Sequence, residues 1–102
     1  MKRLIFAVAA KRDIDEIVAH VAQDNPVAAA KLFQIIDSAA QRLRTFPSLG
    51  RPGRMPGTRE LSLAGTSYLI VYDVGDEVVT ILAIFHTSRD LAQELRRRLL
   101  PD

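Results

Sequence analysis

Three arginines stand close together in a stretch that disfavours regular secondary structure. The residues from Pro47 to Arg59 include three prolines, three glycines and the arginines Arg51, Arg54 and Arg59, with no acidic residue. Proline lacks a backbone N–H donor and glycine is permissive, so we expect residues 47–57 to be neither helix nor strand. Because a guanidinium group binds carboxylate or phosphate through two parallel hydrogen bonds, this loop is suited to an anionic partner. The alternative is a solvated connection whose arginines only aid solubility.

Aromatic and imidazole groups form a second set of candidates. His86 ends a predicted strand, where it could act as a general acid or base, or could instead be held structurally by nearby backbone or by Asp90. Tyr68 and Tyr72 are four residues apart in one predicted strand and therefore share a face, either in the core or on an aromatic contact surface. Arg59 lies in the first of the strands predicted after the loop. The rigid backbone of a strand could aim its side chain at a partner's carboxylate, unless a nearby acid pairs with it.

Several kinds of site are disfavoured by the residues present. The chain has no cysteine, which excludes disulfides and thiolate metal sites and fits a cytoplasmic protein. No spacing of His, Asp and Glu suggests a metal site, and no Lys-Ser/Thr phosphate cradle follows Gly50, so we expect no cofactor. His20 is interpreted as an exposed or rim residue of the first helix. The apolar stretch over residues 4–10 is too short for a membrane span or a signal peptide.

A strand and two helices are predicted in the first half of the chain. Residues 2–8 carry β-branched and aromatic side chains, which favour a strand. A helix over residues 9–23 follows from the apolar spacing of Ile14, Ile17, Val18 and Val21. Asp24 or Asn25 can cap the next helix, with Pro26 at its first position. Its apolar face is expected to comprise Leu32, Ile35, Ile36, Ala39, Leu43 and Phe46, so the two helices should form an antiparallel hairpin.

Three strands are predicted in the second half, over residues 58–63, 67–74 and 77–86. The apolar residues of the last strand are nearly continuous, which is typical of a strand covered on both faces. The helical hairpin can cover only one sheet face. A C-terminal helical stripe of Leu91, Leu95 and Leu99 could stack on the other face, but it is too small to cover a four-stranded sheet. We therefore expect a partner protein to bind the remaining apolar surface.

The length and composition indicate one domain. The chain has 102 residues, of which 48% are hydrophobic and 25% charged, and its formal net charge is +2. These values are ordinary for a globular protein. The predicted fold is α+β over residues 1–102: a helical hairpin on a four-stranded, mainly antiparallel sheet in the order β-α-α-β-β-β, with a short C-terminal helix. A basic face on a nearly balanced chain favours a specific acidic partner over general coating of nucleic acid.

The order of these elements resembles the RelE/ParE superfamily of small bacterial toxins, and the chain looks like a ParE-type member. The resemblance covers nearly the whole chain and rests on the order and spacing of five segments, namely Ala9-Ala-Lys-Arg-Asp-Ile14, Phe46-Pro-Ser-Leu-Gly-Arg-Pro52, Gly57-Thr-Arg-Glu-Leu61, Tyr68-Leu-Ile-Val-Tyr72 and Ile84-Phe-His-Thr-Ser-Arg-Asp90. It implies a toxin held inactive by a cognate antitoxin. The ParE branch poisons DNA gyrase, whereas the RelE branch cuts messenger RNA on the ribosome.

The residues argue against the nuclease branch. RNA cleavage without a metal needs a base, an acid and cations that stabilise the phosphorane. A RelE-like nuclease would place basic residues on the first meander strand and an arginine directly after Tyr68. Here Arg59 is the only basic residue of that strand, Leu69 follows Tyr68, and the C-terminal tyrosine common in such nucleases is missing after His86.

The sequence thus predicts a toxin that works by binding proteins and has no catalytic residues. The expected partners are a cognate antitoxin, in a hetero-oligomer, and DNA gyrase, with DNA contacted only through the antitoxin and no membrane association. Two alternatives stay open: a ribosome-dependent endoribonuclease, and a degenerate member that only binds its antitoxin or DNA through it. The residues expected to bind the antitoxin or the target are Arg51, Arg54, Arg59, Tyr68, Tyr72, His86 and Arg89.

Overall fold

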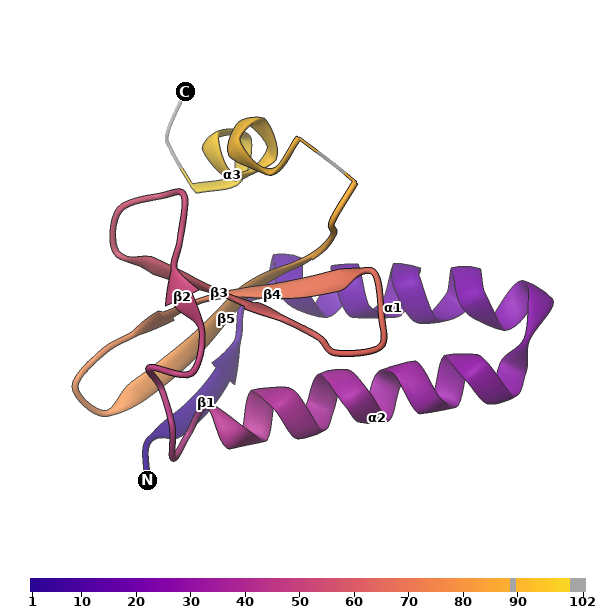
Figure 1. Cartoon of the computed structure of the whole chain (residues 1–102), viewed down its shortest axis with the longest axis horizontal. Helices are drawn as coiled ribbons and strands as arrows, with labels where there is room; N and C mark the ends of the chain where they lie inside the picture. The colour runs from indigo at the N-terminus through magenta and orange to yellow at the C-terminus, as the bar shows by residue number, and fades with distance from the viewer. Residues whose placement is uncertain (89, 100–102) are drawn as a thin grey trace.

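The computed structural model describes residues 1–88 and 90–99, with only the backbone for residue 99. Within these residues, three helices and five strands follow one another (Figure 1). In chain order they are β1 (Arg3–Phe6), α1 (Val8–Asp24), α2 (Pro26–Arg42), β2 (Arg51–Pro52), β3 (Thr58–Ser62), β4 (Tyr68–Val74), β5 (Val78–His86) and α3 (Leu91–Leu99). The α+β class and the predicted element order are confirmed. Within the described residues, none of the helices has the length and apolarity needed to cross a bilayer.

The tight joint between α1 and α2 depends on one short polar segment. Asn25 ends α1 in an extended conformation, and its side-chain Oδ1 accepts a hydrogen bond from the Ala28 backbone N–H at 3.0 Å. Pro26 follows as the first residue of α2, where its missing N–H leaves no helical bond unmade. The predicted hairpin and its cap are therefore confirmed. Phe46 is an exception: α2 ends at Arg42, and the Phe46 side chain is exposed instead of joining the apolar face.

The sheet has five strands in the order β1-β5-β4-β3-β2, one more than predicted. β1 pairs in parallel with β5, and the other neighbours are antiparallel. The additional strand is β2, which lies in the loop predicted to have no strand and pairs Arg51 with Glu60 and Pro52 with Arg59. An edge strand tolerates proline, because the outer side of the edge needs no N–H donor.

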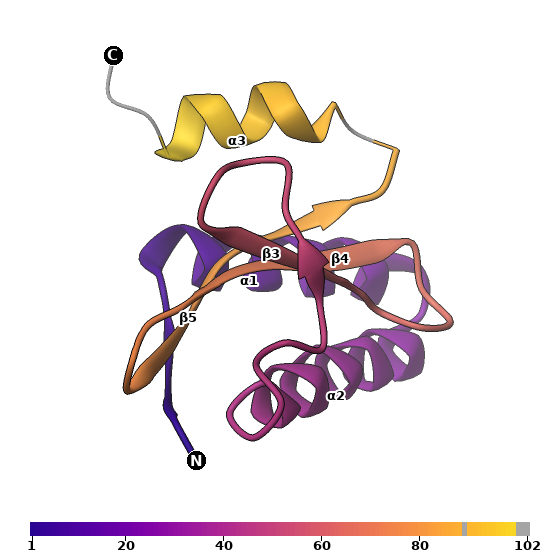
Figure 2. The ribbon, with the colours of Figure 1, turned by 60° about the vertical axis from the view of Figure 1, so that its left-hand side comes forward.

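Both faces of the sheet are covered, and we name them by their covers. The hairpin face packs against α1 and α2 and includes Ile70, Tyr72, Val79, Ile81 and Ile84. The α3 face lies under α3 and includes Leu69, Val71, Ala83 and Phe85. Figure 2 shows α3 on one side of the sheet and the helical hairpin on the other. A register shift between Val71 and Tyr72 on β4, opposite Leu82, helps to explain why the apolar residues of β5 do not alternate strictly.

The expectation of an uncovered sheet face is therefore wrong. Only four side chains of the α3 face form its apolar centre, and Leu91 and Leu95 of α3 bury them, with Met55 packed against the same cluster. A nine-residue helix is enough because the centre is confined to β4 and β5. On this side of the sheet, Ile5 of β1, which pairs with Thr80, stays 45% exposed beyond that centre.

Candidate protein-interaction site

The candidate residues lie in three places. Arg51 and Arg54 gather around Glu60, whose strand partner on β4 is Val71 of the α3 face. Arg59 is paired with Tyr72 and so belongs to the hairpin face. The third group is Tyr68 with His86, which pair across β4 and β5. Arg89 is outside the described residues.

Glu60 organises two of the loop arginines. Its carboxylate is buried and accepts a hydrogen bond from the Arg54 backbone N–H at 2.9 Å. Arg51 Nη2 lies 3.3 Å from Glu60 Oε1, while Arg54 Nη1 lies 4.0 Å from the same oxygen. Both arginine side chains stay substantially exposed, so Glu60 fixes the loop and leaves guanidinium surface available to a partner. Sequence reasoning missed Glu60, although an acid beside three arginines was a signal for this role.

Tyr72 and Arg59 hold the turn that precedes β2. The buried Tyr72 hydroxyl donates to the Pro47 carbonyl and accepts from the Gly50 backbone N–H, both at 2.8 Å. Arg59 Nη1 donates to the Gly50 carbonyl at 2.6 Å. Burial raises the pKa of Tyr72, opposed by the Gly50 hydrogen bond and by the Arg59 charge. Of the two alternatives for Tyr72, the structure shows the position in the core. The Arg59 side chain binds a backbone carbonyl, whereas the sequence predicted a partner's carboxylate or a nearby acid.

His86 contacts its own strand end. Its ring packs edge-on against Tyr68, with centroids 5.2 Å apart and an interplanar angle of 86°. Nδ1 accepts from the Ser88 backbone N–H at 3.0 Å and lies 2.7 Å from Ser88 Oγ. This arrangement matches the backbone alternative, with Ser88 as the partner in place of Asp90. His86 and Tyr68 also line a cleft of about 400 Å³ beside α1, where the exposed His20 is another lining residue.

Asp13 joins α1, β5 and α3. The buried carboxylate accepts from the Ile84 backbone N–H at 3.0 Å and from Arg98 through two bonds of 2.7 and 2.8 Å. The Arg98 guanidinium also lies 4.8 Å from the Phe85 ring centroid. Its hydrogen bond to Asp13 raises the pKa of Arg98. Sequence reasoning missed this pair, although Asp13 adjoins the apolar stripe of α1, where a buried acid needs a partner.

A groove runs between α2 and the β3–β4 turn. Two adjoining hollows of about 390 and 400 Å³ share Lys31 and Ile35 as lining residues. The apolar lining comes from Val21, Ala28, Leu32, Ile35, Ala39, Leu63 and Ala64, and the groove reaches Arg42 at one end and His86 at the other. The lining includes no acidic residue. Such a groove suits an apolar segment that carries acids. Elsewhere in the described part of the chain, no group of three or more His, Cys, Asp or Glu could hold a metal ion.

The fold and these contact surfaces define a RelE/ParE-like toxin domain. The family model of the ParE toxin of the type II toxin–antitoxin system parDE matches residues 4–91. The chain therefore belongs to the ParE toxin family of type II toxin–antitoxin systems.

Individual proteins agree with this assignment. The Y4kP protein of Sinorhizobium fredii is 39% identical over 94 residues, which cover 92% of this chain and 97% of that protein. Toxin RelE1 of Caulobacter vibrioides is 32% identical over 85 residues, covering 81% and 90%. A chain from the chromosomal ParDE system of P. aeruginosa superposes with a TM-score of 0.76 at 28% identity, covering 84% of this chain and 96% of that one. The toxin family predicted from the sequence is confirmed.

Proposed function

We propose that this toxin acts by binding DNA gyrase, without catalysis of its own, and that a cognate antitoxin neutralises it in a hetero-oligomer. The observation that carries the proposal is the position of Leu69. A RelE-like nuclease would need a phosphate-stabilising arginine there, whereas Leu69 is buried under α3 among Val71, Ala83 and Phe85. An apolar, covered surface offers a phosphorane no charge stabilisation. This supports action by protein contact over RNA cleavage.

The groove beside α2 supports an antitoxin partner. ParDE of P. aeruginosa and the RelBE2 complex of Mycobacterium tuberculosis, to which the chain is similar, are toxin–antitoxin assemblies. In this chain, Lys31 in the middle of the groove and Arg42 at one end accompany an apolar lining, so an amphipathic acidic segment complements the groove in both respects. We infer that the antitoxin's C-terminal segment occupies it, and that DNA is reached only through the antitoxin.

A ribosome-dependent endoribonuclease is the second candidate. The 32% identity to toxin RelE1 and the cleft that holds His86, His20 and Arg98 favour it. Two of the groups in this cleft are already engaged, because His86 Nδ1 lies within hydrogen-bond distance of Ser88 and Arg98 is paired with Asp13. A degenerate member that only binds its antitoxin is the third.

A supercoiling assay tests the proposal. The purified chain, added to DNA gyrase with relaxed plasmid and ATP, should inhibit supercoiling or trap cleaved plasmid. Equimolar cognate antitoxin should restore activity. The control toxin is Leu43→Asp, which places a charge in the buried core and should abolish the effect by unfolding. Unchanged supercoiling at a large excess of folded toxin would contradict the gyrase proposal.

A further inference from the structure

We propose that this toxin binds its target through the turn formed by residues 46–50. Phe46 and Leu49 would insert into an apolar pocket of a folded protein, and the rim of that pocket would carry carboxylates. The inference rests on the proposed function, in that the chain is taken to act by binding a protein. It adds the surface that does so and the chemistry of the site that receives it.

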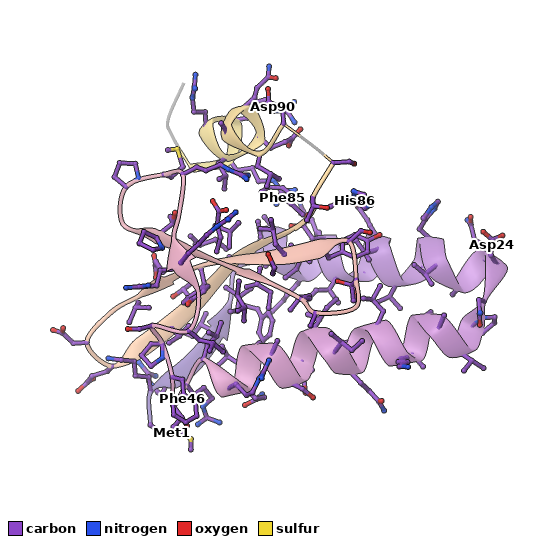
Figure 3. All side chains as sticks on the ribbon, viewed as in Figure 1. Met1, Asp24, Phe46, Phe85, His86 and Asp90 are labelled. Carbon is purple, nitrogen blue, oxygen red and sulfur yellow. The ribbon has the colours of Figure 1, made fainter. Side chains whose placement is uncertain are left out.

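Two large apolar side chains are displayed on this short turn. Phe46 is 61% exposed and Leu49 is 48% exposed. They are linked by a hydrogen bond from the Leu49 N–H to the Phe46 carbonyl at 3.1 Å, so one compact turn carries both. In Figure 3 the Phe46 side chain lies near Met1, at the lower left of the molecule. Exposed apolar groups gathered in this way mark contact sites, and aromatic anchors contribute much of the affinity at such sites.

The turn is held rigidly from beneath. The Tyr72 hydroxyl binds both Pro47 and Gly50, and Arg59 binds Gly50 again, so three hydrogen bonds tie the turn to the sheet. Position 50 also has no room for a side chain, because a Cβ there would lie 2.6 Å from Tyr72 Oη and 2.8 Å from the Glu60 carbonyl oxygen. The two apolar groups are therefore fixed before binding. Preorganisation of this kind lowers the entropy lost on association.

The charges around the turn indicate what the partner must offer. All five charged residues from Arg42 to Arg59 are arginines, and Asp76 and Glu77 line a hollow together with Pro47 of the turn. The Arg51 side chain, just after the turn, is 63% exposed despite its contact with Glu60. Carboxylates on the partner's rim would complement this charge and speed association.

The shape of the turn selects the class of partner. The turn presents its apolar groups outward at a corner of the molecule, so the complementary surface must be a preformed hollow. A folded protein such as the target can supply one, whereas an unfolded antitoxin segment would fit the groove beside α2. We therefore assign the turn to the target.

The double variant Phe46→Ala/Leu49→Ala tests this assignment. The matched control is Val27→Ala, which shortens an 80% exposed apolar side chain at the start of α2. Each toxin is purified with its antitoxin and separated from it, and its affinity for gyrase is measured by biolayer interferometry at two salt concentrations. We expect the double variant to bind gyrase at least about tenfold more weakly while still binding antitoxin as wild type does, and the control to match wild type. Should the double variant not fold, Phe46→Ser alone replaces it.

The outcomes separate this inference from the gyrase proposal. If wild type and the double variant bind gyrase equally, the inference is overturned and the gyrase proposal stands. If wild type does not bind gyrase, growth arrest on expression without antitoxin becomes the readout. If the double variant no longer arrests growth but still binds antitoxin, the turn is the contact to another target. If the double variant and wild type arrest growth equally, or if wild type causes no arrest, the inference is overturned. If the rate of association with gyrase does not fall as the salt concentration rises, the claim that carboxylates line the rim of the pocket is overturned.

Discussion

The two faces of the sheet are covered in very different ways. The hairpin face is packed by two 17-residue helices that share an extensive core with β4 and β5. The α3 face is covered by one 9-residue helix through Leu91 and Leu95, with Arg98 tying its last turn to Asp13. The hairpin face is thus integral to the fold. The cover of the α3 face depends on few contacts, so each of those contacts should control a separable part of the structure.

The largest expected effect is on the hairpin face. Ile36→Ala removes a fully buried side chain from the centre of α2 and leaves a cavity. The free energy of unfolding should fall by about 3 to 4 kcal/mol, because neighbouring core groups can relax only partly. Denaturant titration followed by circular dichroism measures this loss. Hydrogen exchange should speed up in both helices and the sheet together; faster exchange confined to α2 would contradict an integral hairpin face.

On the α3 face, Arg98→Ala should act locally. The change leaves the buried Asp13 carboxylate with the Ile84 N–H alone and removes the cation above Phe85. We expect a loss of about 2 kcal/mol, below the usual cost of breaking a buried pair because Arg98 is partly exposed. Amide exchange should accelerate in α3 while α2 keeps its protection. Arg97→Ala is the matched control, since its pair with Glu94 lies on the exposed side of α3; an equal effect of the two variants would argue against the Asp13 contact.

Tyr72→Phe tests the link between the hairpin face and the 46–50 turn. Loss of the hydroxyl leaves the Pro47 carbonyl and the Gly50 N–H without this partner. The free energy of unfolding should therefore fall by about 1 to 2 kcal/mol. Because burial raises the pKa of Tyr72 above 10.0, the phenolate is favoured in the unfolded chain. The contribution of Tyr72 to the free energy of unfolding of the wild type should therefore be constant below pH 10 and should decrease as the pH rises above 10. The variant should decline less steeply; parallel alkaline slopes would show that Tyr72 is not the group responsible.

The smallest effect on stability is expected from Arg51→Ala/Arg54→Ala. The two guanidinium groups are substantially exposed and lie 3.3 and 4.0 Å from Glu60, and the buried Glu60 carboxylate keeps its hydrogen bond from the backbone N–H of residue 54, so stability should fall by no more than about 1 kcal/mol. Association with gyrase, the proposed target, should slow and lose part of its salt dependence, whereas dissociation changes little. Arg59 is left intact because it holds Gly50 and its removal would disturb the turn. Stopped-flow association at two salt concentrations decides between this and the alternative, in which the arginines only aid solubility and the rates are unchanged.

The two faces also differ in how far the sequence predicts them. Local signals foretold the hairpin: Asn25 and Pro26 fix its corner, and periodic apolar residues fix its buried side. Tyr68 and Tyr72 were correctly placed on one face by strand periodicity. On the α3 face, the stacking of Leu91 and Leu95 on the sheet was one of the predicted alternatives, but the ion pair of Asp13 with Arg98 escaped prediction because it joins positions 85 residues apart. No local pattern reports such a pairing.

The sequence named candidate residues for the site but did not predict how they are arranged. The sequence located the loop arginines, yet it treated them as one surface, and the pairing of β3 with β4 divides them between two faces. Phe46 was expected in the core because it continues the helical spacing of α2, but the helix ends before it and the turn carries it outward. The end of α2 at Arg42 is therefore the reason that Phe46 is exposed and does not pack in the core.

Messenger RNA integrity in a translating extract tests most directly whether this toxin acts by contact or by catalysis. The purified toxin is added with and without antitoxin, and transcript ends are mapped by primer extension. Since Leu69 and its neighbours present a buried apolar surface where a nuclease would need cations, transcripts should stay full length even at toxin concentrations at which we expect gyrase inhibition under the proposed function. Codon-dependent cleavage products that appear with wild type and vanish with His86→Ala would contradict this, and would establish the ribonuclease in its place.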